Sequence, residues 1–172
     1  MIKIGINGFG RIGRLILRAL LENYKGKIQI VGINDLGSIE ANAHLIKYDS
    51  THGTLNHEVK VTSGGFKIGD QDIKVFAERD PVKLPWGKIG VDVVLECTGF
   101  FLDKESAGKH ILAGAKKVII SAPAKEVDFT VVQGVNSNDL NKNHNIISNG
   151  SCTTNCLAPV AMVLENTFGI EY

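Results

Sequence analysis

The sequence lacks both a strong excess of charge and any long apolar run. Its 172 residues contain 19 Lys and Arg against 18 Asp and Glu, a net charge of +1. A balance so close to zero gives no electrostatic reason to bind nucleic acid or a membrane surface, and we expect neither as a partner. No segment reaches the length of a membrane-spanning helix, and the apolar start is too short for a signal peptide. We therefore expect a cytoplasmic protein.

Cysteine is also scarce, and its placement excludes a disulfide scaffold. The three cysteines, Cys97, Cys152 and Cys156, are odd in number and lack the spacing of a disulfide framework, which fits a reducing compartment. Cys97 lies in an apolar run and is predicted to be a small buried hydrophobic residue. Cys152 and Cys156 lie four residues apart, which is not the usual spacing of a zinc site, so we expect no metal.

The chain has no repeats or linkers, and strand and helix patterns alternate along it. Residues 57–76 alternate polar and apolar side chains, as an antiparallel meander does. Elsewhere fully apolar strands are separated by helices, which predicts a mostly parallel sheet covered on both faces. We predict an α/β, Rossmann-type doubly wound sheet with an inserted meander. The expected strands are 2–6, 28–33, 91–95, 118–120, 129–132 and 146–147, and the expected helices are 12–20, 39–47, 103–112 and 157–168.

A glycine-rich turn near the start predicts a dinucleotide site. The run Gly8-Phe9-Gly10-Arg11-Ile12-Gly13 has the Gly-x-Gly-x-x-Gly spacing, follows a strand and opens a helix. Asn34 and Asp35 end the second strand, where a carboxylate accepts hydrogen bonds from ribose hydroxyls and repels a 2′-phosphate. This context favours NAD over NADP. The alternative is a glycine turn in an unrelated α/β protein.

Two further strand ends are candidates for the same ligand. Thr98 and Gly99 follow one apolar strand, and Ser121 follows the next. Ligands of doubly wound sheets bind at the carboxyl ends of the strands, so these residues are candidates to line the nicotinamide half. An ordinary strand-to-loop turn explains them equally well.

The end of the chain carries a candidate nucleophile. Cys152 lies between Ser151 and Thr153 at the junction of a strand and a helix, where free backbone N–H groups and the helix dipole favour a thiolate. The simpler alternative is that Ser151 caps the helix and Cys152 is incidental. None of the five histidines is placed beside Cys152 by the sequence, so each is read as a surface or packing residue.

These motifs resemble phosphorylating glyceraldehyde-3-phosphate dehydrogenase. The resemblance runs along the whole chain in order. It rests on Asn7 to Arg14, Ile33 to Asp35, Lys47 to Gly53, Glu78 to Pro81, Glu96 to Gly99, Ser121 to Pro123 and Ser148 to Pro159. Erythrose-4-phosphate dehydrogenase is a close relative with a similar cysteine motif, and it stays open as an alternative.

The resemblance implies roles for individual residues. Cys152 would attack the aldehyde of glyceraldehyde 3-phosphate, and inorganic phosphate would cleave the resulting thioester. Ser151 and Thr153 would contact the substrate or phosphate. The implied NAD-binding residues are Asn7, Gly8, Phe9, Gly10, Arg11, Ile12, Asn34, Asp35, Arg79, Thr98, Gly99 and Ser121. Arg11 and Ile12 would hold the pyrophosphate, and Thr98 and Ser121 would lie along the nicotinamide half. The family implies a homotetramer.

The resemblance also divides the chain into parts. Residues 1–150 would form the NAD-binding domain, and residues 151–172 would begin the catalytic domain. Family members are roughly twice as long and carry their catalytic histidine beyond this segment, so we expect the chain alone to bind NAD but to be nearly inactive. Two alternatives are a redox-sensing thiol module and self-association through an exposed apolar patch. That patch would comprise Leu157, Val160, Ala161 and Leu164.

Overall fold

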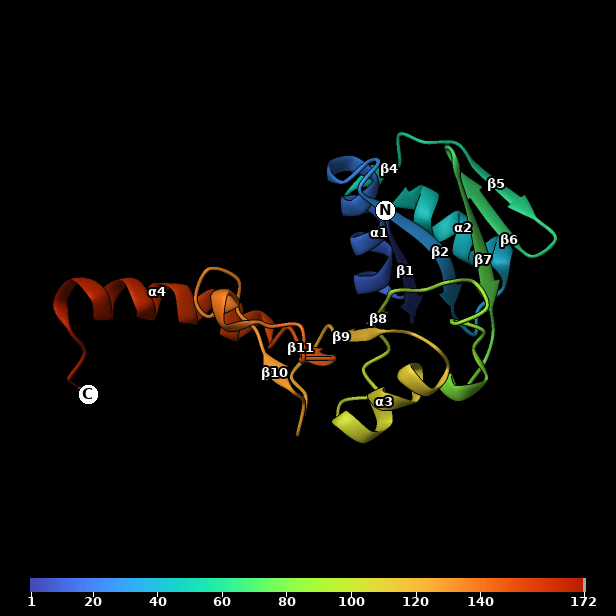
Figure 1. The fold of residues 1–172 in the computed structure, drawn as a ribbon. Helices are drawn as coiled ribbons and strands as arrows, with labels where there is room; N and C mark the ends of the chain where they lie inside the picture. The colour runs from blue at the N-terminus through green and yellow to red at the C-terminus, as the bar shows by residue number, and fades with distance from the viewer. Residues whose placement is uncertain (172) are drawn as a thin grey trace.

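A nine-stranded sheet forms the centre of the molecule (Figure 1). The computed structural model describes residues 1–171. The strand order is β10-β11-β9-β8-β1-β2-β7-β6-β5, and all neighbours from β10 to β7 run parallel. This confirms the predicted mostly parallel α/β sheet. The strands are β1 (Ile2–Asn7), β2 (Ile28–Asn34), β5 (Val59–Thr62), β6 (Gly65–Ile68), β7 (Gln71–Phe76), β8 (Val93–Glu96), β9 (Lys117–Ile120), β10 (Phe129–Thr130) and β11 (Ile146–Ser148).

The predicted meander is present as β5, β6 and β7, but it extends the main sheet. β6 pairs antiparallel with both of its neighbours, whereas β7 also pairs parallel with β2 from Gly32–Lys74 to Asn34–Phe76. The end of β7 therefore lies beside the end of β2, and the loop that follows β7 reaches the same edge of the sheet. A separate two-stranded sheet is formed by β3 (Tyr48–Asp49) and β4 (Gly53–Thr54).

Four helices accompany the sheet, and three of them begin at side-chain caps. They are α1 (Arg11–Asn23), α2 (Ile39–Lys47), α3 (Lys104–Leu112) and α4 (Cys152–Phe168), with 3₁₀ turns η1 (Pro81–Lys83) and η2 (Ser137–Asp139). The side chains of Ser38, Asp103 and Ser151 accept hydrogen bonds from backbone N–H groups in the first turns of α2, α3 and α4. Helix α1 follows Gly10 and has no such cap, which leaves its first turn open.

The core is split between the two faces of the sheet because successive strand residues point in opposite directions. On β1, Ile4 and Ile6 pack with Leu17 of α1 in one cluster. The intervening Gly5 faces Trp86, which belongs to a second cluster with Val94 of β8. A third cluster joins residues of α3, β9 and β11. The sheet is thus covered on both faces, as the fully apolar strands predicted.

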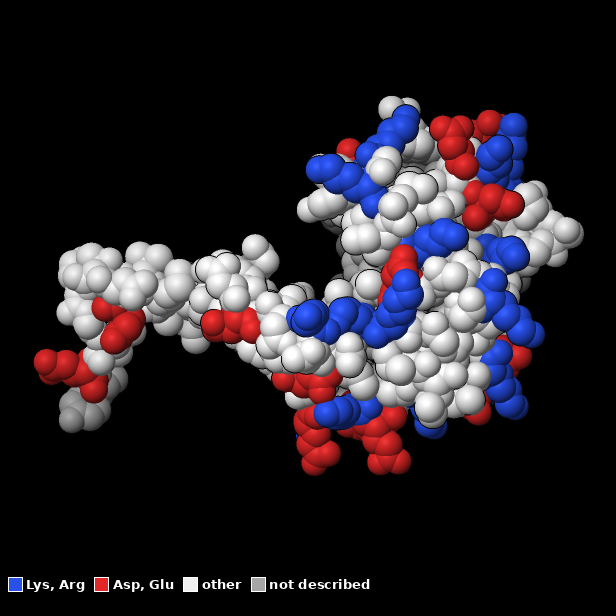
Figure 2. Space-filling view, in the orientation of Figure 1, with Lys and Arg blue, Asp and Glu red and all other residues white. Residues whose placement is uncertain are grey.

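Helix α4 projects away from the sheet as an arm (Figure 1). None of its residues is buried, and its only charged residue is Glu165, so its surface is mostly uncharged in Figure 2. Leu157, Val160 and Leu164 are exposed as expected, whereas Ala161 is half-buried. Self-association through this face stays a prediction. So does the boundary at residue 151, and Tyr172 at the end of that segment lies outside the described residues.

Over residues 1–171, the structure contains no helix that combines the length and apolar character needed to span a bilayer.

Candidate functional site

The turn between β1 and α1 has the geometry that the glycine spacing predicted. Gly8 has a φ of +90°, and a Cβ there would lie 2.8 Å from the backbone nitrogen of Thr98. A Cβ on Gly13 would lie 2.2 Å from the carbonyl oxygen of Gly8, so the helix could not approach the turn. A Cβ on Gly10 would meet nothing within 4 Å, because Gly10 faces open space. The turn is therefore closely packed at Gly8 and Gly13 and open at Gly10.

The open first turn of α1 is a ready anion site. Phe9 donates its backbone N–H to Asp35 and Gly8 donates to the Asn34 carbonyl, each at 2.8 Å. The N–H groups that follow, at the start of α1, have no side-chain cap. Unpaired N–H groups and the positive end of the helix dipole together favour a phosphate.

Asp35 lies at the end of β2 and is fixed by the backbone around it. One carboxylate oxygen accepts the Phe9 N–H, and the other accepts the Gly37 N–H at 2.8 Å. Oδ1 also lies 3.5 Å from the Asn42 amide nitrogen, whereas Oδ2 has the Phe9 donor and retains lone-pair capacity for a ligand hydroxyl. The carboxylate is thus oriented before any ligand arrives.

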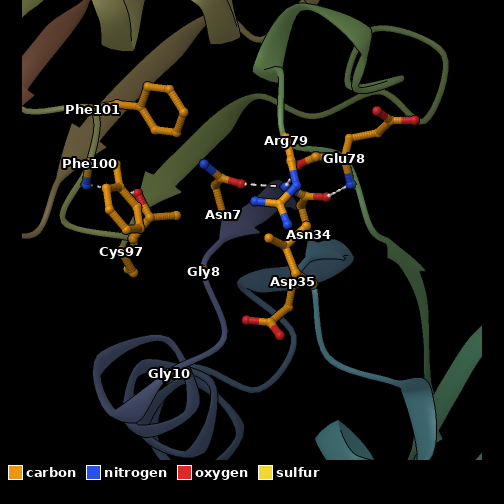
Figure 3. A pocket seen from close by; sticks show the side chains of 12 residues that line it. Asn7, Gly8, Gly10, Asn34, Asp35, Glu78, Arg79, Cys97, Phe100 and Phe101 are labelled. Carbon is orange, nitrogen blue, oxygen red and sulfur yellow. Dashed lines mark hydrogen bonds between the residues drawn. The ribbon is translucent and has the colours of Figure 1, made fainter.

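A cavity of about 500 Å³ opens at the carboxyl ends of β1, β2, β7 and β8. In Figure 3, Asp35 and Arg79 lie on one side of it and Phe100 and Phe101 on the other, with Gly10 below. Its lining consists of Asn7, Gly8, Gly10, Asn34, Asp35, Leu36, Glu78, Arg79, Cys97, Thr98, Phe100 and Phe101. The cavity therefore brings together seven of the twelve residues that the sequence proposed for NAD: Asn7, Gly8, Gly10, Asn34, Asp35, Arg79 and Thr98.

The other five proposed residues lie outside this cavity. The Phe9 side chain is buried in the core against Phe66, so only its backbone faces the turn. The Arg11 guanidinium forms an ion pair with Asp49. Ile12 is half exposed on α1. Gly99 and Ser121 do not line the cavity.

The position of Thr98 bears on its predicted role. The sequence grouped Thr98 with Ser121 along the nicotinamide half. In the structure Thr98 shares a cavity with Asp35 and Arg79, and Ser121 does not. Thr98 therefore lies with Asp35, which the sequence assigns to the ribose hydroxyls.

Sequence reasoning missed several residues of the cavity and one buried pair beside it. Phe100 is 83% exposed directly after Thr98 and Gly99, and an exposed aromatic side chain at a strand end is a signal that could have been used. Cys97 lines the wall, and burial raises the pKa of its thiol to about 11, so it is a protonated wall residue. His110 is fully buried against Glu96, a pairing that no spacing in the sequence indicates.

Cys152 is the first residue of α4, at the helix start as predicted, and it is exposed. The Ser151 hydroxyl caps the helix through the Thr154 N–H at 2.9 Å and also contacts the hydroxyl of Thr153 at 2.9 Å. The cap reading of Ser151 is therefore confirmed, and it coexists with a thiol at the helix start. None of these residues lines the cavity at the other strand ends.

The four histidines other than His110 lie in different environments. His44 packs on Tyr48, and His144 stacks on Phe129. His52 contacts Asp49, and His57 lines a second cavity at the opposite end of the sheet strands. Within residues 1–171 there is also no group of three or more His, Cys, Asp or Glu side chains arranged to hold a metal ion.

Comparison with known proteins identifies the family. A family model described as the NAD binding domain of glyceraldehyde 3-phosphate dehydrogenase matches residues 2–104. The chain belongs to this family. The matched residues include every residue that lines the cavity, from Asn7 to Phe101, so the cavity lies wholly within the part that defines the NAD-binding domain.

Curated relatives match almost the entire chain. The glyceraldehyde-3-phosphate dehydrogenase of Clostridium pasteurianum is 56% identical over 171 residues, which are 99% of this chain and 51% of that protein. Glyceraldehyde-3-phosphate dehydrogenase 1 of Bacillus subtilis is 54% identical over 171 residues, and the enzyme of Geobacillus stearothermophilus is 56% identical over 170. This member of the glyceraldehyde-3-phosphate dehydrogenase family spans about half the length of the curated relatives it matches.

Proposed function

We propose that this chain binds NAD with the adenosine end in the cavity at the ends of β1, β2, β7 and β8. The observation that carries the proposal is that the whole cavity lies within the family's NAD-binding domain. Its volume of about 500 Å³ suits part of a dinucleotide. Asp35 would accept hydrogen bonds from the ribose hydroxyls, Arg79 and Phe100 would hold the adenine, and the first turn of α1 would hold the pyrophosphate.

The same residues support a preference for NAD over NADP. A 2′-phosphate on the adenosine ribose would meet the carboxylate of Asp35, which is held in place by the Phe9 and Gly37 N–H groups. Two negative groups at hydrogen-bonding distance repel each other. The carboxylate cannot turn away without breaking both of these hydrogen bonds.

For the full-length protein we propose the oxidation of glyceraldehyde 3-phosphate to an acyl phosphate. NAD supplies the hydride acceptor. The Cys152 sulfur attacks the aldehyde carbon to form a thiohemiacetal, which becomes a thioester when its hydride and hydroxyl proton leave. Phosphate then attacks the carbonyl carbon, the C–S bond breaks and the thiol is regenerated. Ser151 and Thr153 place hydroxyl groups beside this centre.

Catalysis by the Cys152 thiol needs a general base and further residues that enclose the substrate. The histidines of residues 1–171 all have surroundings away from Cys152. We propose that the base belongs to the half of the full-length relatives that this chain does not span. The isolated chain is then nearly inactive, because general base catalysis alone contributes about 10²–10⁴-fold.

Calorimetric titration with NAD and NADP tests the proposal. We expect NAD binding in the micromolar to millimolar range and weaker NADP binding. Asp35→Ala should weaken NAD binding by about 10- to 100-fold, because hydrogen bonds to a charged group contribute about 1.5–3 kcal/mol. Asp72→Ala is the matched control, because Asp72 is an exposed carboxylate on β7 outside the cavity. Absence of NAD binding, or equal effects of the two variants, would contradict the proposal.

A further inference from the structure

A continuous chain of hydrogen bonds runs beneath the cavity across the ends of four parallel strands. The Asn34 side chain pairs with both backbone groups of Glu78, at 2.8 Å each, and donates to Asn7 Oδ1 at 2.7 Å (Figure 3). Asn7 Nδ2 donates to Glu96 Oε2, which also contacts His110 Nε2 at 2.9 Å. The chain thus joins the wall after β7 to α3 through the ends of β2, β1 and β8.

Glu96 is the member on which both walls of the cavity depend. Its Oε1 accepts the backbone N–H of Thr98 at 2.7 Å and the Thr98 hydroxyl, while Oε2 holds Asn7 and His110. Glu96 is only 1% exposed and does not line the cavity itself, whereas Thr98 and Asn7 do. Any effect of Glu96 on a ligand is therefore exerted through the residues it holds.

The direction of the hydrogen bonds follows from Trp86 at one end and from the backbone groups of Glu78 at the other. The indole N–H of Trp86 donates to His110 Nδ1 at 3.0 Å, and an indole nitrogen can only donate. His110 therefore carries its proton on Nε2 and donates it to Glu96. Asn34 donates its amide nitrogen to Asn7 Oδ1, so Asn7 presents its own amide nitrogen to Glu96, 3.4 Å from His110 Nε2.

Burying the carboxylate of Glu96 carries a free-energy cost. Removing the charge from water costs several kcal/mol unless donors surround it, and apolar replacements are often as stable. Glu96 has four donors, from Thr98, Asn7 and His110, so the charge is compensated. A carboxylate can accept from all four at once, which a neutral amide cannot.

We infer that Glu96 is a positioning residue for NAD, which sets the separation of the two cavity walls through Asn7 and Thr98. The inference rests on the proposed NAD binding at this cavity. Glu96→Gln replaces one acceptor oxygen with an NH₂ group. That group faces donors whichever way the amide turns, and His110 cannot switch its proton to Nδ1 without losing Trp86. The walls then separate, although the substitution changes no atom that NAD touches.

The first test compares the wild-type chain with Glu96→Gln. It measures NAD affinity and the amide hydrogen exchange of residues in the two cavity walls. We expect the NAD dissociation constant to rise about tenfold or more, with the chain still folded by circular dichroism. Without ligand, amide hydrogen exchange should accelerate at both Thr98 and Glu78, on opposite walls. Arg18→Lys is the control, because Arg18 is a buried residue that donates to Ile46, Lys47 and Gly53 outside the cavity. It should leave the NAD affinity and both exchange rates unchanged.

A double-mutant cycle separates positioning from general stability. Asn7→Asp puts an acceptor opposite the amide nitrogen of Gln at position 96, so it should harm NAD binding less in the Glu96→Gln background than in the wild-type chain. Equal harm in both backgrounds would overturn the inference. If Glu96→Gln does not fold, His110→Leu removes one of the four donors to Glu96 and should raise the NAD dissociation constant by a smaller factor.

The outcomes distinguish the two proposals. A wild-type chain that does not bind NAD refutes the proposed function, and the exchange rates at Thr98 and Glu78 still decide whether Glu96 holds the walls. NAD binding that is equally tight in Glu96→Gln, with unchanged exchange at both amides, refutes the positioning role alone. Detection of His110 with its proton on Nδ1 by ¹⁵N resonance would overturn the chain of donors.

Discussion

Replacing Gly5 with alanine should destabilise the protein, although Gly5 does not have a positive φ. A Cβ at Gly5 would lie 3.0, 3.1 and 3.2 Å from three atoms of the six-membered ring of Trp86. Trp86 is fully buried and packs edge-on against Phe76, with the ring centroids 6.1 Å apart. Its indole N–H donates a hydrogen bond to His110. The ring has no room to retreat, so the new methyl group forces a shift of β1 or of Trp86.

The magnitude follows from two opposing effects. Overpacking in a dense core costs about 1–3 kcal/mol, whereas Gly to Ala in a strand gains about 0.5–1 kcal/mol by restricting the unfolded chain. The net loss for Gly5→Ala is about 1–2 kcal/mol. With a urea dependence of about 1–3 kcal/mol per molar, the unfolding midpoint should fall by roughly 0.5–1.5 M. Gly64→Ala is the control, because a Cβ there would meet nothing within 4 Å.

A second substitution shows whether Trp86 is the cause. Trp86→Phe removes the ring atoms that the new Cβ would meet, at its own cost of about 2–4 kcal/mol from lost packing and an unpaired His110 nitrogen. In that background Gly5→Ala should become nearly neutral. Urea unfolding followed by far-ultraviolet circular dichroism measures all four chains. Equal losses from Gly5→Ala with and without Trp86 would refute the reasoning.

Two further predictions concern titrating groups. The hydrogen bond and ion pair from Lys104, followed by the backbone N–H of Ile146, lower the pKa of Asp128 from its ordinary 3.8 to about 2. The contribution of Asp128 to the free energy of unfolding is present above about pH 4 and is lost as the pH falls toward 2. In urea unfolding, Asp128→Asn should abolish this part of the dependence on acid pH. Burial raises the pKa of Cys97 to about 11, so iodoacetamide at pH 8 should label the exposed Cys152 and Cys156 before Cys97, as peptide mass spectrometry can measure. Rapid labelling of Cys97 in the folded chain would contradict this assignment.

Local structure could be predicted closely from the sequence because its signals are local. The pattern of residues 39–47 predicts a helix with the observed limits, and the helix expected over 103–112 is observed as α3, with Asp103 as its cap. The turn at Gly8 and Gly13 also follows from neighbouring residues, because close backbone contacts require glycine there. Phe9 shows the limit of this approach, since its position in the motif does not reveal that its side chain enters the core.

Contacts between distant parts of the chain could not be predicted in the same way. Nothing in the alternating pattern of residues 57–76 shows that β7 pairs with β2, yet this pairing brings Arg79 to the cavity. Glu96 and His110 lie on different elements, and their contact depends on the depth at which α3 packs. Buried polar pairs of this kind follow no sequence period, so reasoning from periodicity left His110 as an unspecified surface or packing residue.

The strand order explains why the cavity forms where it does. The connection after β1 leads to β2 on one side, and the connection after β8 leads to β9 on the other side, so the loops after β1 and β8 diverge. A crevice must open at such a point in a doubly wound sheet. Backbone hydrogen bonds join the strand ends here, from the Gly8 N–H to the Asn34 carbonyl and from the Cys97 N–H to the Asn7 carbonyl. The side chains from Asn34 through Asn7 to Glu96 add a second connection across the same strand ends. The buried polar residues at the ends of β1, β2 and β8 are thus the structural counterpart of the cavity that lies above them.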